Sequence, residues 1–293
     1  MLKENVFRLG DVSLNVAQGP KSGPPLLLIH GGGGRWQEFL PILPALSMRW
    51  HLHAVDLRGH GKSSWADGQY RPEQYVTDVL AYIDAQAIEK VVLFGVSLGG
   101  WVALLTAAEL GDKVSGLILG DPPLNIERFK IDESLPDRVA MWRTVRAQVG
   151  HGMNIDELAE VLADMPISVP EADEPARYGD IPGVNPLQIR SWAADLHQLD
   201  PNALMYHAGG RIHEYVEHVD IERMLAVIKC PTLLIQADSS KGGMETDDEA
   251  AAALDLLDNG LHVKLDDVGH DLGLSSWNID QLLSSLTSFL ESL

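Results

Sequence analysis

The sequence is poor in cysteine and in basic residues, and each shortage excludes a class of protein. Cys230 is the only cysteine, so no intrachain disulfide can form and a reducing compartment suits the chain. The chain has 22 lysine and arginine residues against 42 acidic residues, which gives a net charge of −20, and its basic residues form no cluster. Nucleic acid and anionic membrane surfaces are therefore not expected as partners.

Long apolar stretches, internal repeats and low-complexity tracts are also lacking. No stretch approaches the length that a bilayer-spanning helix needs. The first residues lack the apolar core of a signal peptide. We therefore expect a soluble cytoplasmic protein whose acidity serves solubility. With 293 residues, of which 45% are hydrophobic, the chain is long enough to bury a full core.

Short apolar runs alternate with patterns of helical spacing over most of the chain. Runs of strand length occur at residues 6–9, 12–17, 26–29, 51–55, 91–94, 114–119, 231–237 and 262–265. Helical patterns occur between or after them, at residues 36–46, 75–88, 101–110, 247–257 and 277–290. This alternation predicts an α/β fold with a mostly parallel, eight-stranded sheet flanked by helices.

The alternation stops after the sixth strand. Helical patterns without a convincing buried strand occur at residues 138–149, 155–163 and 187–199, and a loop rich in proline and acid covers 166–186. We therefore expect residues 124–229 to be a helical insertion that lies over the sheet. Residues 1–123 and 230–293 would form the core.

The pentapeptide Gly-Val-Ser-Leu-Gly at residues 95–99 connects a predicted buried strand directly to a predicted helix. A strand that turns sharply into a helix through a serine between glycines is a nucleophile elbow. Glycine is required where the turn is tight, because a Cβ beside the strained serine would collide with the neighbouring strand and helix. The pattern predicts that Ser97 is a nucleophile.

Three further motifs occur around the elbow. They are His-Gly-Gly at 30–32, Asp-x-Arg-Gly-x-Gly-x-Ser at 56–63 and Val-Gly-His at 268–270. In this order the four motifs resemble the α/β-hydrolase fold family, in its capped, esterase-like branch. The motifs that carry the resemblance lie in the two segments that flank the insertion. The insertion itself resembles the family only in its position along the chain. It implies that the insertion after strand 6 is a cap over the active site.

The resemblance implies a role for each motif. Ser97 would attack the substrate, and because a serine hydroxyl is weakly acidic it needs a base, which the family keeps at the position of His270. The oxyanion formed by this attack needs preorganised amide donors. Leu98, directly after the nucleophile, and Gly32, in the glycine loop, occupy the family's positions for these donors.

Two aspartates compete for the acid that orients the histidine. Most of the family keeps this acid after the strand that follows the cap, where Ser240 stands in this chain and Asp238 lies two residues early. A minority places it after the strand that precedes the cap, where Asp121 fits without a shift. The sequence leaves Asp121 and Asp238 as alternatives.

A serine nucleophile implies acyl chemistry, because the dehalogenases and epoxide hydrolases of the family use a carboxylate in the elbow. We expect hydrolysis of a small to medium carboxylic ester or lactone through an acyl-enzyme. Carbon–carbon bond hydrolysis, perhydrolysis and a low-turnover ligand receptor are the alternatives. Candidates for substrate contact are the following residues of the glycine loop and the insertion: Gly33, Trp142, Trp192, Met205 and Tyr206.

No cofactor or metal ion is expected. His213 and His218 are five residues apart and do not share a helix face as a zinc-binding i, i+4 pair does. The expected partner is a small-molecule ester or lactone, with a homodimer left open.

Overall fold

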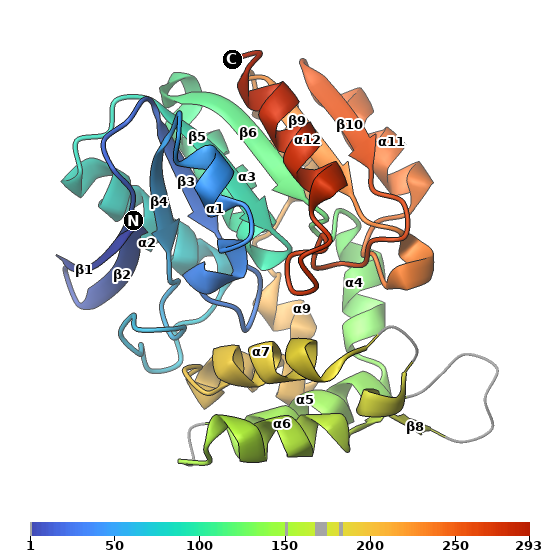
Figure 1. The fold of residues 1–293 in the computed structure, drawn as a ribbon. Helices are drawn as coiled ribbons and strands as arrows, with labels where there is room; N and C mark the ends of the chain where they lie inside the picture. Colours follow the sequence, from blue (N-terminus) through green and yellow to red (C-terminus); the bar gives the residue numbers. More distant parts are fainter. Residues whose placement is uncertain (1, 150–151, 168–174, 182–183) are drawn as a thin grey trace.

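A single eight-stranded sheet forms the centre of the molecule (Figure 1). A computed structural model of the chain describes residues 2–149, 152–167, 175–181 and 184–293. The strands are β1 (Lys3–Leu9), β2 (Val12–Gln18), β3 (Pro25–Ile29), β4 (His51–Val55), β5 (Val91–Val96), β6 (Val114–Gly120), β9 (Thr232–Gln236) and β10 (Gly260–Lys264). Their order is β1-β2-β4-β3-β5-β6-β9-β10, and all pairs are parallel except β1 with β2 and β2 with β4. The predicted mostly parallel, eight-stranded sheet is confirmed.

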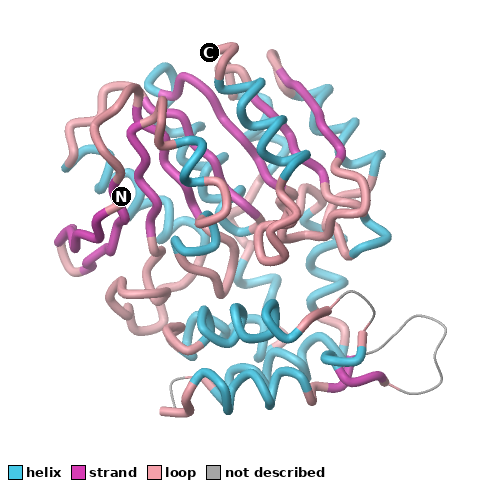
Figure 2. The backbone as a smooth tube through the Cα atoms, viewed as in Figure 1, coloured by secondary structure: helices cyan, strands magenta, loops and turns pink. Residues whose placement is uncertain are grey.

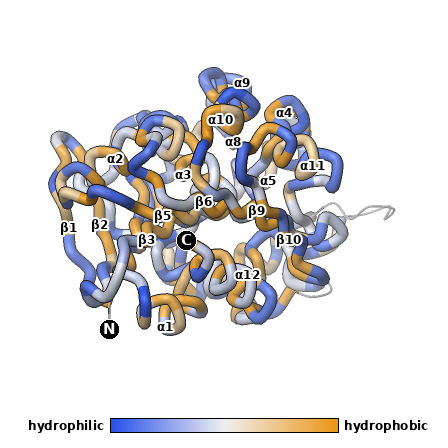
Figure 3. The backbone as a smooth tube through the Cα atoms, turned by 90° about the horizontal axis from the view of Figure 1, so that it is seen from above, coloured by the Kyte–Doolittle hydropathy of each residue, from blue (hydrophilic) through white to orange (hydrophobic). Residues whose placement is uncertain are grey.

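Helices cover both faces of the sheet. Figure 3 shows α1 (Leu43–Leu46) and α12 (Asp280–Leu290) on one side. The other side carries α2 (Pro72–Ala85), α3 (Leu98–Leu110) and α11 (Asp247–Leu256). Successive strand residues point to opposite faces, so neighbouring apolar residues enter different layers. Leu27 belongs to the core beneath α2 and α3, whereas Leu28 belongs to the core beneath α1 and α12.

Two of the differences between predicted and observed helices have a backbone cause. The pattern at 36–46 is divided into the 3₁₀ turn η1 (Trp36–Phe39) and the short α1, because Pro41 cannot donate a helical hydrogen bond. The last helix starts at Asp280 instead of residue 277. Trp277 has a φ of 60°, a left-handed conformation that cannot begin a right-handed helix.

The segment between β6 and β9 is mostly helical. It contains α4 (Ile126–Glu133), α5 (Pro136–Gln148), α6 (Ile155–Ala163), η3 (Tyr178–Asp180), α7 (Pro186–Leu196), η4 (Pro201–Leu204), α8 (Met205–Gly209), α9 (Ile212–Tyr215) and α10 (Ile221–Val227). It also contains a two-stranded sheet of β7 (Pro166–Ile167) and β8 (Ala176–Arg177), which the sequence did not predict. Within the predicted loop at 166–186, residues 168–174 and 182–183 lie outside the described residues.

Helices α5, α6 and α7 lie beyond the carboxyl ends of the parallel strands (Figure 1). Figure 2 shows loops gathered between these helices and the sheet. Contacts across this layer include an ion pair between Arg35 Nε and Asp195 Oδ1 at 2.5 Å and a hydrogen bond from Asp200 N to Gly59 O at 2.7 Å. The loops that follow the strands therefore lie between the sheet and this helical segment. Among the described helices, none is both long enough and apolar enough to cross a bilayer.

Candidate active site

Ser97 lies in a strained turn between β5 and α3. Its φ is 54° and its ψ is −120°, a combination that L-residues adopt only when the surrounding structure enforces it. A Cβ on Gly95 would lie 1.9 Å from Gly99 O, and a Cβ on Gly99 would lie 2.1 Å from Ile29 O. No side chain fits at either glycine, because neighbouring backbone atoms lie too close. This is the tight turn that the pentapeptide predicts.

The side chains of Ser97, His270 and Asp121 form one line of hydrogen bonds. His270 Nε2 is 2.8 Å from Ser97 Oγ, and His270 Nδ1 is 2.6 Å from Asp121 Oδ2. The three residues follow three different strands, β5, β10 and β6. Since these strands are parallel, their carboxyl ends meet at one edge of the sheet. Nδ1–H donated to the carboxylate leaves the lone pair of Nε2 facing the serine hydroxyl, the tautomer that a base requires.

The two candidate aspartates have different surroundings. Asp121 is fully buried, and its carboxylate also accepts the amide N–H groups of Met244 at 2.8 Å and Ala237 at 3.2 Å. The carboxylate of Asp238 accepts the N–H of Ser240 as the N-cap of η5 (Ser239–Lys241). The structure therefore brings Asp121 to His270, while Asp238 stabilises a turn.

The backbone N–H groups of the glycine loop differ in whether they have an acceptor. The N–H groups of Gly31, Gly33 and Gly34 donate to Glu38 Oε2, His60 Nε2 and Gly31 O. In the part of the chain that the structure describes, the N–H groups of Gly32 and Leu98 have no protein acceptor. These are the two amides that the sequence predicts as oxyanion donors, and their roles remain a prediction.

Replacement of Gly32 by proline should lower kcat by about 100- to 1000-fold, because proline has no N–H to stabilise an oxyanion. Gly32→Ala is the matched control. A Cβ at this position would lie 3.8 Å from Leu98 Cδ2, an ordinary contact, so alanine keeps both the fold and the N–H. Steady-state kinetics of both variants on one ester would check this. Equal activity of the two would show that this amide does not act as a donor.

Two buried histidines from the sequence motifs, His30 and His60, support the glycine loop. His30 Nε2 accepts the N–H of Leu57 at 3.0 Å, and His60 Nε2 accepts the N–H of Gly33 at 3.1 Å. Burial lowers the pKa of His30 to about 4 and that of His60 to about 3. Both rings are therefore neutral at pH 7, and each can accept a hydrogen bond. Their places in the motifs at 30–32 and 56–63 were the signal available in the sequence.

An acidic side chain also contacts this loop. Glu38 on η1 accepts the N–H of Gly31. Burial, with the charges of Asp195 and Asp271 nearby, raises the pKa of Glu38 to about 8. Its carboxyl group is therefore largely protonated at pH 7 and adds little negative charge beside the place where an oxyanion would form. Nothing in the sequence pattern distinguished Glu38 from surface glutamates.

The residues predicted to contact substrate make other contacts. Trp142 Nε1 donates to Glu133, the ring of Trp192 lies 5.5 Å from that of Tyr178, and Tyr206 Oη accepts from Arg71 Nε. Met205 is partly buried against the core that these helices share with the sheet. Gly33 faces α7, since a Cβ there would lie 3.6 Å from Leu196 Cδ2. Substrate contact by any of these residues remains a prediction.

The described residues contain no group of three or more histidine, cysteine, aspartate or glutamate side chains that could hold a metal ion. His213 and Glu214 approach each other at 4.0 Å on α9. His218 lies beyond the end of that helix.

A sequence model described as the alpha/beta hydrolase fold matches residues 24–275. The (lyso)-N-acylphosphatidylethanolamine lipase of Bos taurus is 35% identical over 102 residues, which are 33% of this chain and 30% of that protein. The 2-(acetamidomethylene)succinate hydrolase of Mesorhizobium japonicum is 27% identical over 239 residues, or 80% of this chain and 77% of that protein. The crystal structure of an E-2-(acetamidomethylene)succinate hydrolase superposes with a TM-score of 0.74 and 23% identity, over 99% of this chain and 100% of that one. At this identity the likeness concerns the fold.

Proposed function

The chain belongs to the alpha/beta hydrolase fold family, and from this premise we propose that it is a serine hydrolase of small to medium carboxylic esters or lactones. Ser97 is the nucleophile, His270 the general base and Asp121 the acid that orients it. The observation that carries the proposal is the continuous line of hydrogen bonds from Asp121 through His270 to Ser97. The names of the matched relatives, a lipase and a hydrolase, support hydrolytic chemistry.

The proposed reaction has two half-reactions. Ser97 Oγ forms a bond to the carbonyl carbon while its proton passes to His270 Nε2, and the amides of Gly32 and Leu98 hold the oxyanion. The tetrahedral intermediate collapses, the carbon–oxygen bond to the leaving group breaks, and His270 gives that oxygen its proton. In the second half-reaction a water molecule gives a proton to His270 and forms a bond to the acyl carbon. The bond from that carbon to Ser97 Oγ then breaks, and His270 returns the proton to Oγ, which releases the acid.

The helical segment 124–229 is the cap in this proposal. Its helices face the carboxyl ends of the strands (Figure 1), and the Arg35–Asp195 ion pair joins it to the residues just after the glycine loop. A cap in this position selects the acyl and leaving groups that reach Ser97. It also limits access of water to the oxyanion, which strengthens the amide hydrogen bonds.

A panel of substrates tests the proposal. We expect turnover of p-nitrophenyl esters or lactones, with an initial burst of p-nitrophenol close to one equivalent of enzyme when deacylation is slower than acylation. The panel should include thioesters and 2-(acetamidomethylene)succinate, because a relative is named for the latter. If the protein hydrolyses every compound of the panel no faster than buffer alone does, the proposal is contradicted. A melting temperature that rises with added ligand, without any turnover, would favour a receptor.

A further inference from the structure

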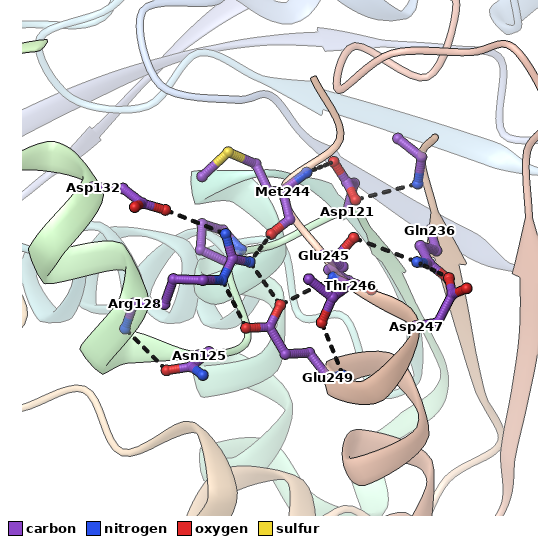
Figure 4. Close-up of polar contacts among 12 residues, drawn as sticks. Asp121, Asn125, Arg128, Asp132, Gln236, Met244, Glu245, Thr246, Asp247 and Glu249 are labelled. Carbon is purple, nitrogen blue, oxygen red and sulfur yellow. Dashed lines mark hydrogen bonds and ion pairs between the residues drawn. The ribbon is translucent and has the colours of Figure 1, made fainter. Parts of the chain in front are cut away.

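A charged network connects the helical segment to the acid of the site (Figure 4). Arg128 lies on α4, the first helix after β6. Its guanidinium pairs with both carboxylate oxygens of Glu249 on α11, at 2.7 and 2.6 Å. A third hydrogen bond goes from Arg128 Nη2 to the main-chain oxygen of Met244. The arginine thus holds a helix of the core and a loop of the core together.

The Met244 residue continues this network to Asp121. Its N–H donates to Asp121 Oδ2 at 2.8 Å, the same oxygen that accepts from His270 Nδ1. The main-chain oxygen of Met244 therefore accepts from Arg128, while the main-chain N–H of the same residue donates to the Asp121 carboxylate. The only other backbone donor to Asp121 among the described residues is Ala237 N, at the longer distance of 3.2 Å.

The residue after Met244 carries a buried acidic side chain. Glu245 is fully buried, and neither of its carboxyl oxygens has a hydrogen-bond partner among the described residues. Burial raises its pKa far above the usual range, and the neighbouring charges of Asp121 and Glu249 act in the same direction. Three acidic side chains thus lie close together, and Arg128 is the cation that interacts with Glu245 and pairs with Glu249. A buried, unpaired carboxyl group costs free energy, so the hydrogen bond from Arg128 to Met244 offsets part of a local cost in this loop.

We propose that Arg128 is a positioning residue, which fixes Asp121 against His270 through the Met244 main chain. The inference rests on the proposed function, because it assigns importance to the orientation of Asp121. It makes the reactive geometry depend on the docking of α4, which belongs to the helical segment, against the core. A displacement of the loop by about 1 Å is enough to lower the rate of a positioned reaction by about 100-fold.

The test compares Arg128→Met and Arg128→Lys with the wild type. We expect Arg128→Met to lower kcat by about 10- to 100-fold with little change in KM. It should also weaken or broaden the far-downfield proton resonance of the His270–Asp121 hydrogen bond, assigned by its loss in His270→Ala. Lysine keeps the charge but lacks the planar guanidinium group that bonds to Glu249 and Met244 at the same time. We therefore expect the kcat of Arg128→Lys to lie between that of Arg128→Met and that of the wild type.

Asp132→Ala is the matched control. Asp132 pairs with the same arginine at 3.2 Å, and the side chains of Arg128 and Asp132 are 34% and 41% exposed, so solvent screening leaves this pair a small contribution. Its loss should leave kcat within about twofold and the downfield resonance unchanged. The inference is overturned if Arg128→Met is folded and keeps both the wild-type kcat and the resonance. If that variant does not fold, wild-type values for both readouts in Arg128→Lys overturn it. Failure of the proposed function would instead appear as wild-type turnover that does not depend on Ser97.

Discussion

Asp121→Asn should lower kcat by about ten-thousandfold, because an asparagine cannot satisfy the donors around the native carboxylate. Oδ2 accepts from His270 and Met244, and Oδ1 accepts from Ala237. If the amide nitrogen replaces Oδ2, it faces His270 Nδ1 and favours the tautomer with its proton on Nε2, which cannot accept a proton from Ser97. If the amide nitrogen replaces Oδ1, two donors face each other, the side-chain NH₂ group and the N–H of Ala237.

Asp238→Asn is the control for this variant. Its side chain accepts a hydrogen bond from Ser240 at the start of a turn, and the oxygen of asparagine can accept the same bond. We expect kcat to stay within about twofold of the wild type, since no contact joins this position to the histidine among the described residues. Steady-state kinetics on one ester, with melting temperatures for both variants, would measure the difference. Equal losses in the two variants would refute the assignment of Asp121.

Ser97→Ala should lower kcat by about a millionfold, because it removes the atom that forms the acyl-enzyme. The backbone strain stays the same, since alanine also carries a Cβ at the φ of 54°. The variant should therefore be folded, and the burst of alcohol product should disappear together with turnover. The exposed Ser284 on α12 offers a control, and Ser284→Ala should keep the wild-type rate. Esterase activity retained in Ser97→Ala would place the nucleophile elsewhere.

The strained turn at Ser97 was predictable because its determinants are local. The strand, the two glycines, the serine and the start of the helix lie within about ten residues, and the glycines are required by contacts that any such turn makes. The mostly parallel, eight-stranded sheet followed similarly from the apolar runs and their alternation with helical patterns, and it is confirmed. Shorter helices such as α8 and α9 were not predicted, since four or five residues carry too little periodicity.

The choice between Asp121 and Asp238 could not be made from the sequence, because it depends on contacts between distant segments. Asp121 Oδ2 meets Met244 N across 123 positions of the chain and His270 across 149. The loop after β9 turns so that its main chain, and not the side chain of Asp238, meets this site. The network from Arg128 to Met244 is equally non-local, with 116 positions between the two residues.

The most direct test of the central claim is the mass of the intact protein after reaction with a p-nitrophenyl phosphonate, followed by mapping of the modified peptide. Such a reagent captures a serine whose hydroxyl is activated by a neighbouring histidine. We predict one phosphonyl group per chain, on Ser97, with no addition in Ser97→Ala and slow addition in Asp121→Asn. Modification of Ser97→Ala at the wild-type rate, or of a residue other than Ser97 in the wild type, would contradict it.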